Sequence, residues 1–196
     1  MILRPELLIA GYCQGIFPMA DETGRIGWYE PLVRAIIPLD GFTVPRRLAR
    51  TVRSGRFEVR IDYDFRAVVQ ACAATGPGRE QTWISLAMID AYTKLHQLGY
   101  AHSVESWRDG QLVGGLYGVS IGGLFAGESM FHHERDASKV ALVQLVDHLR
   151  RHGFVLLDSQ YIVGEHMRQF GTIEISRDEY QQRLQAALQV QARFGA

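Results

Sequence analysis

An acid and an amide, two residues apart, follow an almost wholly apolar segment late in the chain. Asp158 and Gln160 come after Leu156 and Leu157, and residues 154–158 have the composition of a strand covered on both faces. Alternate residues of a strand point to the same side of a sheet, so the two polar side chains are expected to share one face. The pair therefore predicts a site that handles hydrogen bonds and a proton.

A second acid, Glu128, lies between Gly127 and Ser129 in an otherwise apolar segment. A buried carboxylate requires partners. Three remain open from the residues alone, namely a cationic side chain of a substrate, a ribose and an internal arginine. A purely structural role for Glu128 is the alternative.

The elements that position these residues follow from hydrophobic periodicity and turn residues. Residues 112–139 predict a strand, a glycine-rich turn, a second strand and a helix start, and Asp109-Gly110 predicts a hairpin turn before them. Ser176 to Glu179 predicts a capping box. Helices are expected at 5–12, 45–53, 65–74, 86–98, 137–151, 164–170 and from 176. Strands are expected at 33–39, 57–61, 101–107, from 111, at 123–131, 154–158 and 172–175. The aromatic segments 15–19 and 27–31 are expected to be loops.

Length and composition allow one large domain or a small domain joined to a larger one. The chain has 196 residues, of which 47% are hydrophobic and 21% charged, with a formal net charge of zero. Gly76-Pro77-Gly78 interrupts the pattern, so we expect a small N-terminal α/β domain at 1–78 and a larger domain at 79–196. Neither cysteine belongs to a CxxC pair and no window has 18 apolar residues, so we expect a soluble, cytoplasmic protein, and a monomer.

Arginines form a local basic patch in the first domain. Arg46, Arg50 and Arg53 share one face of the predicted helix, and Arg47 lies beside them. Such a face can bind the phosphate backbone of a nucleic acid, or it can simply be solvated. Both interpretations remain open.

Histidines give no convincing metal site. His132-His133 and the pair His148/His152 have suggestive spacing, but no cysteine or carboxylate completes a ligand set beside them. We expect no metal.

Many short blocks in one order resemble the leucyl/phenylalanyl-tRNA–protein transferases, and the likeness covers nearly the whole chain. Each block alone is unspecific, whereas the set is highly specific. The blocks lie at residues 15–19, 28–31, 83–84, 101–107, 112–119, 125–131, 137–139 and 158–160.

The resemblance implies an activity and a fold. The activity is transfer of leucine or phenylalanine, and less well methionine, from aminoacyl-tRNA to the α-amine of a protein that begins with Arg or Lys, which feeds N-end-rule degradation. The fold is a GNAT-like domain with a central mixed sheet behind the small N-terminal domain, and no cofactor is expected.

The resemblance also implies roles for residues. Asp158 and Gln160 would be catalytic: Gln160 would accept a hydrogen bond from the incoming amine and donate one to Asp158, which would stabilise the growing ammonium or relay its proton. Glu128 would bind substrate, and Trp28 would lie near the terminal adenosine. The slot for the leucine or phenylalanine side chain would be lined by Trp83, Leu116, Phe125 and Leu157, and transfer RNA would bind Arg46, Arg47, Arg50 and Arg53.

Two positions depart from the family pattern. Ser159 stands where Cys or Thr is usual, and an outward-facing position tolerates this change. The spacing from Gln160 to His166 is one residue longer than usual, which leaves the loop beyond the site, and with it the acceptor preference, open.

Two rival functions remain. A CoA-dependent GNAT acetyltransferase would cradle a pyrophosphate with a glycine-rich helix entry, but residues 132–138 contain no glycine and two acids. A non-catalytic module that binds tRNA or N-degrons would carry the same arginine patch. Transfer of labelled leucine to an Arg-starting peptide distinguishes the enzyme from the module.

Overall fold

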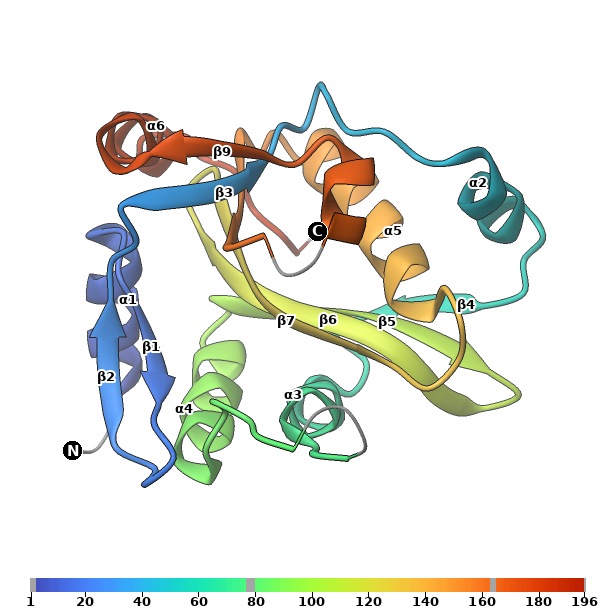
Figure 1. Ribbon diagram of the computed structural model, residues 1–196, viewed down its shortest axis with the longest axis horizontal. Coiled ribbons are helices and arrows are strands. Elements are labelled where there is room, and N and C mark those ends of the chain that lie inside the picture. The colour runs from blue at the N-terminus through green and yellow to red at the C-terminus, as the bar shows by residue number, and fades with distance from the viewer. Residues whose placement is uncertain (1–2, 77–79, 163–164, 196) are drawn as a thin grey trace.

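The protein forms a mixed sheet with helices on both faces (Figure 1). The computed structural model describes residues 3–76, 80–162 and 165–195. The strands are β1 (Phe17–Ala20), β2 (Ile26–Tyr29), β3 (Val33–Ile37), β4 (Glu58–Ile61), β5 (Ala101–Arg108), β6 (Gln111–Ile121), β7 (Leu124–His132), β8 (Leu156–Gln160) and β9 (Ile173–Ser176). The helices are α1 (Pro5–Cys13), α2 (Arg46–Arg53), α3 (Phe65–Ala73), α4 (Leu86–Gln97), α5 (Ala137–Arg151), the 3-10 helix η1 (Glu165–Phe170) and α6 (Arg177–Leu188).

The main sheet has seven strands in the order β4-β5-β6-β7-β8-β3-β9. Strands β4 to β7 pair antiparallel, α5 crosses over so that β8 lies parallel to β7, and β3 lies antiparallel between β8 and β9. The expected central mixed sheet is therefore confirmed.

Strands from both halves of the chain share this sheet. β3 and β4 precede residue 78, yet β3 pairs with β8 and β9, and β4 pairs with β5. Residues 77–79, where the domain boundary was expected, lie outside the described part of the chain. The division at residue 78 stays a prediction, and it does not coincide with a division between sheets.

Turn and cap residues place the elements close to the predicted limits. Asp109 and Gly110 have φ of 51° and 75°, which confirms the tight hairpin between β5 and β6. The Ser176 side chain accepts from the backbone N–H of Glu179, which confirms the cap of α6. Gly153, with φ of 77°, follows the end of α5.

Two predictions about the elements were wrong. Residues 17–20 and 26–29 form the hairpin β1–β2 instead of loops, because the Asp21 carboxylate accepts from the backbone N–H groups of Thr23 and Arg25 and closes the turn. β8 covers 156–160 instead of 154–158, so Asp158 and Gln160 lie within the strand.

Two apolar cores lie on the two faces of the sheet. Helices α1, α3, α4 and α6 contribute buried residues to the first core, and α2 and α5 contribute to the second. In Figure 1, α3 and α4 lie on one side of β5–β7, and α2 and α5 lie on the other. No helix within the described ranges is long and apolar enough to cross a membrane.

Candidate active site

Two irregularities in the sheet bring Glu128, Asp158 and Gln160 together. The β6–β7 register passes from Gly118↔Gly127 to Tyr117↔Ser129, so Glu128 is an extra residue in β7. The β3–β8 register likewise skips Ser159 between Asp158 and Gln160. Such bulges bend a strand and redirect side chains beside functional sites.

The bulges lie where β7 and β8 stop pairing. Their last parallel pair is Ala126↔Asp158, so Glu128 and Gln160 lie beyond it. Gly118 allows the close approach of β6 and β7 there, because a Cβ on it would lie 2.4 Å from the Ala126 carbonyl oxygen. The site is thus built at the point where two neighbouring strands end their ladder.

Asp158 is completely buried and has four donors around its two carboxylate oxygens. Arg34 donates Nε to Oδ1 at 2.9 Å and Nη2 to Oδ2 at 2.7 Å. The Tyr180 hydroxyl donates to Oδ2 at 2.9 Å, and the backbone N–H of Gln160 donates to Oδ1 at 2.8 Å. A carboxylate offers about four acceptor positions. Asp158 therefore has no free acceptor position for an incoming amine.

Arg34 is itself fixed on all sides. Its Nη1 donates to the Gly15 carbonyl at 2.9 Å, and its guanidinium carbon lies 4.7 Å from the Phe17 ring centroid and 4.3 Å from that of Tyr180. Burial opposes its charge, but Asp158 beside it holds the pKa of the Arg34 guanidinium above its usual value. The two side chains form a buried ion pair.

Glu128 has a different environment. Its side chain keeps 9% exposure, and its two oxygens accept from Tyr92 Oη at 3.0 Å and from Gln160 Nε2 at 2.7 Å. Among the described residues, no cation forms an ion pair with it. Burial raises the pKa of the Glu128 carboxyl to about 7, although the tyrosine hydroxyls act in the opposite direction. Glu128 is therefore suited to take up or release a proton near neutral pH.

A second tyrosine extends the chain of hydroxyls behind Glu128. Tyr12 of α1 and Tyr92 of α4 are both buried, with their hydroxyl oxygens 2.5 Å apart. Burial raises the pKa of both hydroxyls well above the usual value, so both stay protonated. Since Tyr92 donates to Glu128, Tyr12 must donate to Tyr92.

Gln160 is held in an uncommon backbone conformation. Its φ is 61°, in the left-handed region that is rare for residues other than glycine, and its backbone bond to Asp158 fixes it there. A carboxylate can only accept, so the Gln160 NH₂ faces Glu128 and its Oε1 points elsewhere. The predicted donation from the Gln160 side chain to Asp158 was wrong, because Glu128 receives that bond. The acceptance of a hydrogen bond from the amine stays a prediction.

The apolar residues of the predicted side-chain slot are separated by the sheet. Leu116, Phe125 and Leu157 are buried together in the second core. Trp83 packs at the edge of the first core and so does not join them. Trp28 also packs against the first core, where its ring lies against Gly11 of α1.

The predicted basic patch lies on α2. Arg46, Arg47, Arg50 and Arg53 are all exposed, and none has an ion pair with any residue that the structure describes. By contrast, Arg56, just beyond the helix, pairs with Glu134 at 2.7 Å. The four side chains are available to an anionic partner.

Sequence reasoning missed the residues that support the two acids. Arg34 could have been found, because it is the only charged residue in the apolar segment 33–37. Tyr12, Tyr92 and Tyr180 gave no such signal, because a tyrosine on an apolar helix face is usual in a core.

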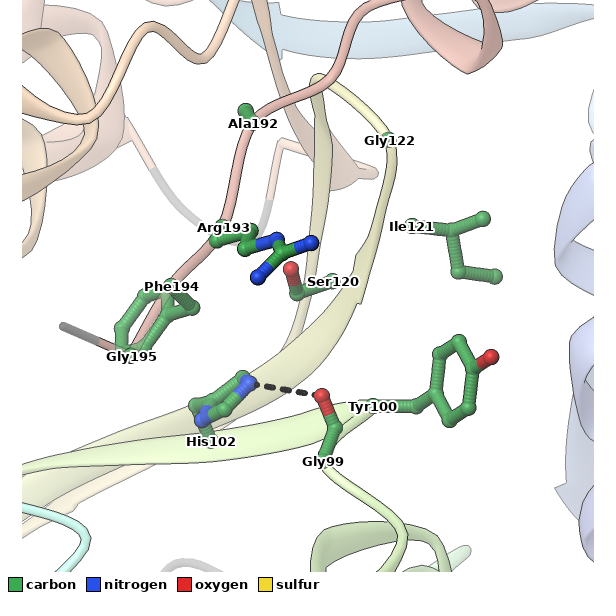
Figure 2. Close-up of a pocket in the computed structure, with 10 residues that line it drawn as sticks. All are labelled: Gly99, Tyr100, His102, Ser120, Ile121, Gly122, Ala192, Arg193, Phe194 and Gly195. Atoms are coloured by element: carbon green, nitrogen blue, oxygen red, sulfur yellow. Dashed lines mark hydrogen bonds between the residues drawn. The ribbon is translucent and has the colours of Figure 1, made fainter.

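Other features lie apart from this site. The cavity in Figure 2, about 340 Å³, is lined by the start of β5, the end of β6 and residues 192–195, and contains none of the predicted site residues. Asp62, His96 and His102 have possible metal-ligating atoms within 4.8 Å of one another. His96 Nδ1 already lies 2.7 Å from the Ala101 carbonyl oxygen, and His102 Nδ1 lies 2.7 Å from Asp62.

Comparison with known proteins agrees with the sequence motifs. The family model described as leucyl/phenylalanyl-tRNA protein transferase matches residues 36–185, and the model of that family's N-terminal domain matches residues 1–32. The longer Gln160-to-His166 spacing includes residues 163–164, which lie outside the described part of the chain.

Curated relatives carry the same name. The leucyl/phenylalanyl-tRNA–protein transferase of Herpetosiphon aurantiacus is 57% identical over 98% of this chain and 98% of its own. That of Nitrobacter winogradskyi is 53% identical over 99% of this chain and 87% of its own. Among solved structures, that of L-PGS from Bacillus licheniformis is 14% identical, covers 81% of this chain and 52% of its own, and has a TM-score of 0.43. The present chain belongs to the leucyl/phenylalanyl-tRNA–protein transferase family.

Proposed function

We propose that this protein transfers leucine or phenylalanine, and methionine less efficiently, from aminoacyl-tRNA to the α-amino group of proteins that begin with Arg or Lys. Membership of the family supports the donor and the reaction. The observation that carries the chemistry is the pair Glu128–Gln160, which lies beyond the last β7–β8 pair and keeps slight exposure to solvent. The product would enter N-end-rule degradation in the cytoplasm.

The donor is already activated, so the site has to position two reactants and manage one proton. The amine nitrogen attacks the carbonyl carbon of the aminoacyl ester, the ester C–O bond breaks, and a peptide bond forms. The proton lost by the amine ends on the ribose oxygen that leaves. Orientation of two reactants contributes about 7–11 kcal/mol, more than the roughly 10²–10⁴-fold of general acid–base help.

Gln160 presents its carbonyl oxygen to the amine. The ionised Glu128 holds the NH₂ end of the amide, so Oε1 faces away from it. Within the described ranges Oε1 accepts no hydrogen bond, and it is therefore available to an incoming N–H. The hydrogen bond from Gln160 to Glu128 thus fixes the amide so that its Oε1 can orient the attacking amine.

Glu128, rather than Asp158, receives or relays the proton. An α-amino group has a pKa of about 7.7–8.0, close to the pKa of about 7 to which burial raises the Glu128 carboxyl. Asp158 has all its acceptor positions filled and supports the site by holding Arg34 and the backbone of Gln160.

Leu116, Phe125 and Leu157 remain the proposed slot for the amino-acid side chain. Trp83 packs on the other face of the sheet and does not join that slot, and Trp28 remains proposed near the terminal adenosine. An apolar slot separates side chains by only about 1–3 kcal/mol per methylene. Some use of methionine is therefore expected. The sheet with its crossover helix α5 is compatible with a GNAT-like domain, which we propose as the catalytic part.

The function is tested by transfer of labelled leucine from charged tRNA to an Arg-starting peptide, with an Ala-starting peptide as the matched acceptor. We expect label on the first peptide and little on the second. Absence of label from both contradicts the proposed function and leaves a binding module. A product formed from acetyl-CoA instead establishes the acetyltransferase.

The arginines of α2 are proposed to bind the body of the tRNA. Reversal of two exposed charges in Arg46→Glu/Arg50→Glu should weaken use of whole aminoacyl-tRNA and leave a phenylalanyl ester of adenosine unaffected. Equal losses with both donors contradict this role for the patch.

A further inference from the structure

A polar cavity of about 430 Å³ lies where β7 ends and α5 begins. In the sequence, residues 132–138 were considered as the pyrophosphate cradle of the rival acetyltransferase, for which they lack the glycines. The lining residues of the cavity are His132, His133, Arg135, Asp136, Ser138 and Lys139.

The charges around the cavity favour an anion. Arg135 is exposed and has no ion pair with any residue in the described ranges. Lys139 Nζ lies 3.9 Å from Asp136 Oδ1, a long contact. The nearby acid Glu134 is already neutralised, because its Oε2 accepts from Arg56 at 2.7 Å and Arg108 at 2.8 Å.

Ser138 is a buried residue in the lining, only 5% exposed, and its hydroxyl has no hydrogen-bond partner among the described residues. Gly114 of β6 allows this position, because a Cβ there would lie 2.5 Å from the Ala137 Cβ and 2.9 Å from the Ser138 nitrogen. A hydroxyl without a partner that borders a cavity with basic side chains is a donor available to an oxyanion.

The cavity lies between the candidate active site and the basic patch. His132 is four residues beyond Glu128 on β7, which corresponds to roughly 13 Å at the rise of a strand. Through Glu134, the loop is tied to Arg56, three residues after the end of α2. Figure 1 shows α2 and the start of α5 toward the same end of the molecule.

We propose that this cavity binds a backbone phosphate of the single-stranded 3′ end of the donor tRNA. Arg135 and Lys139 supply positive charge, and Ser138 donates a hydrogen bond. The phosphate would hold the 3′ end between the ester at Glu128 and the tRNA body at α2. The inference rests on the proposed function, since the donor is an aminoacyl-tRNA.

Donors of three lengths test it: phenylalanyl-adenosine without a phosphate, phenylalanyl-CCA trinucleotide, and whole phenylalanyl-tRNA. The variants are Arg135→Ala/Lys139→Ala, Ser138→Ala, and Arg183→Ala as a matched surface control on α6. We expect the double variant to reduce kcat/KM about tenfold or more with the trinucleotide and the tRNA, and less than about twofold with phenylalanyl-adenosine. Ser138→Ala should give the same pattern with a smaller loss, and the control no loss.

Salt dependence provides a second readout. Each phosphate contact on a single strand contributes a slope of about 0.7 to log K against log salt. The double variant should lower the slope with phenylalanyl-CCA by about that amount. An unchanged slope, or equal losses with all three donors, overturns the proposal.

Direct binding separates this inference from the proposed function. The uncharged CCA trinucleotide, carrying a fluorescent label at its 5′ end, is titrated with each protein, with CoA or inorganic phosphate added as competitors. Weaker trinucleotide binding by the double variant supports the cavity even if no protein transfers an amino acid. Binding of CoA in preference to the trinucleotide overturns it.

Discussion

The two carboxylates of the candidate site, Glu128 on β7 and Asp158 on the neighbouring strand β8, have opposite properties. Asp158 has no exposure and is surrounded by Arg34, Tyr180 and a backbone N–H. Glu128 keeps 9% exposure, and among the described residues its hydrogen-bond donors are the uncharged side chains of Tyr92 and Gln160. The same functional group thus has its acceptor positions filled in one place, and in the other it lies buried without an ion pair among the described residues.

The difference between the two carboxylates distinguishes a residue that holds the site together, Asp158, from one that can take part in the reaction, Glu128. A carboxylate whose acceptor positions are all filled, two of them by an arginine, serves to hold its neighbours in place. A buried carboxylate without a cation has its pKa raised and can exchange a proton near neutral pH. Proximity to the site alone would not have distinguished the two roles.

The largest effect is expected for Glu128→Gln. Loss of the carboxylate should lower the single-turnover rate of transfer by about 10²–10⁴-fold, because the proton acceptor and the orientation of Gln160 are both lost. Rapid-quench measurement at saturating substrates, with the exposed Glu6→Gln as control, checks it. A near-normal rate would assign the proton to another group.

Arg34→Met tests the supporting role of Asp158. Removal of one partner of a buried ion pair should reduce the free energy of unfolding by about 3–5 kcal/mol. Urea unfolding measures it, and the exposed pair Arg183–Glu179 supplies the control, where Arg183→Ala should cost less than about 1 kcal/mol. A similarly small loss for Arg34→Met would mean that Asp158 does not depend on its ion pair.

Tyr92→Phe removes one hydrogen-bond donor to Glu128 and keeps the carboxylate itself. The Tyr92 hydroxyl lowers the pKa of the Glu128 carboxyl against the larger effect of burial. Its removal should therefore shift the acid limb of the pH profile of kcat/KM to higher pH, by about one pH unit. The exposed Tyr100→Phe should leave the limb in place, and a shift to lower pH would contradict the assigned polarity.

The last prediction concerns stability against pH. The folded-state pKa of Glu128, about 7, lies above its ordinary value of 4.5. Its contribution to stability is therefore complete below the ordinary value and is lost as the pH rises through about 7. Wild type should lose more unfolding free energy across this window than Glu128→Gln, as measured by urea titrations at several pH values. Parallel curves would show that Glu128 does not titrate there.

Much of the fold could be predicted because local signals agree with the structure. The Asp109-Gly110 turn and the cap at Ser176 have backbone chemistry that few other conformations satisfy. The hairpin β1–β2 was missed because a side chain, Asp21, closes its turn. The pairing of β3 with β8 was also invisible, since it joins segments more than a hundred residues apart.

The sequence predicted which acids and amide belong to the candidate site, but it did not predict the hydrogen bonds between them. Asp158, Gln160 and Glu128 were identified as polar residues in apolar segments. Their hydrogen bonds depend on two bulges. The extra residue of a bulge cannot be recognised from the alternation of apolar and polar residues along the strand. The tyrosines and Arg34 reach the acids from α1, α4, α6 and β3, so only the tertiary structure connects them.

The place of β3 in the sheet has a consequence for synthesis of the chain. β3 is among the first strands to leave the ribosome, but its neighbours β8 and β9 are the last to be made. More than a hundred residues must therefore be translated after Arg34 before Asp158, its ion-pair partner, is made. A nascent or truncated chain that lacks residues 156–176 has neither strand partner for β3, so activity can begin only when translation is nearly complete.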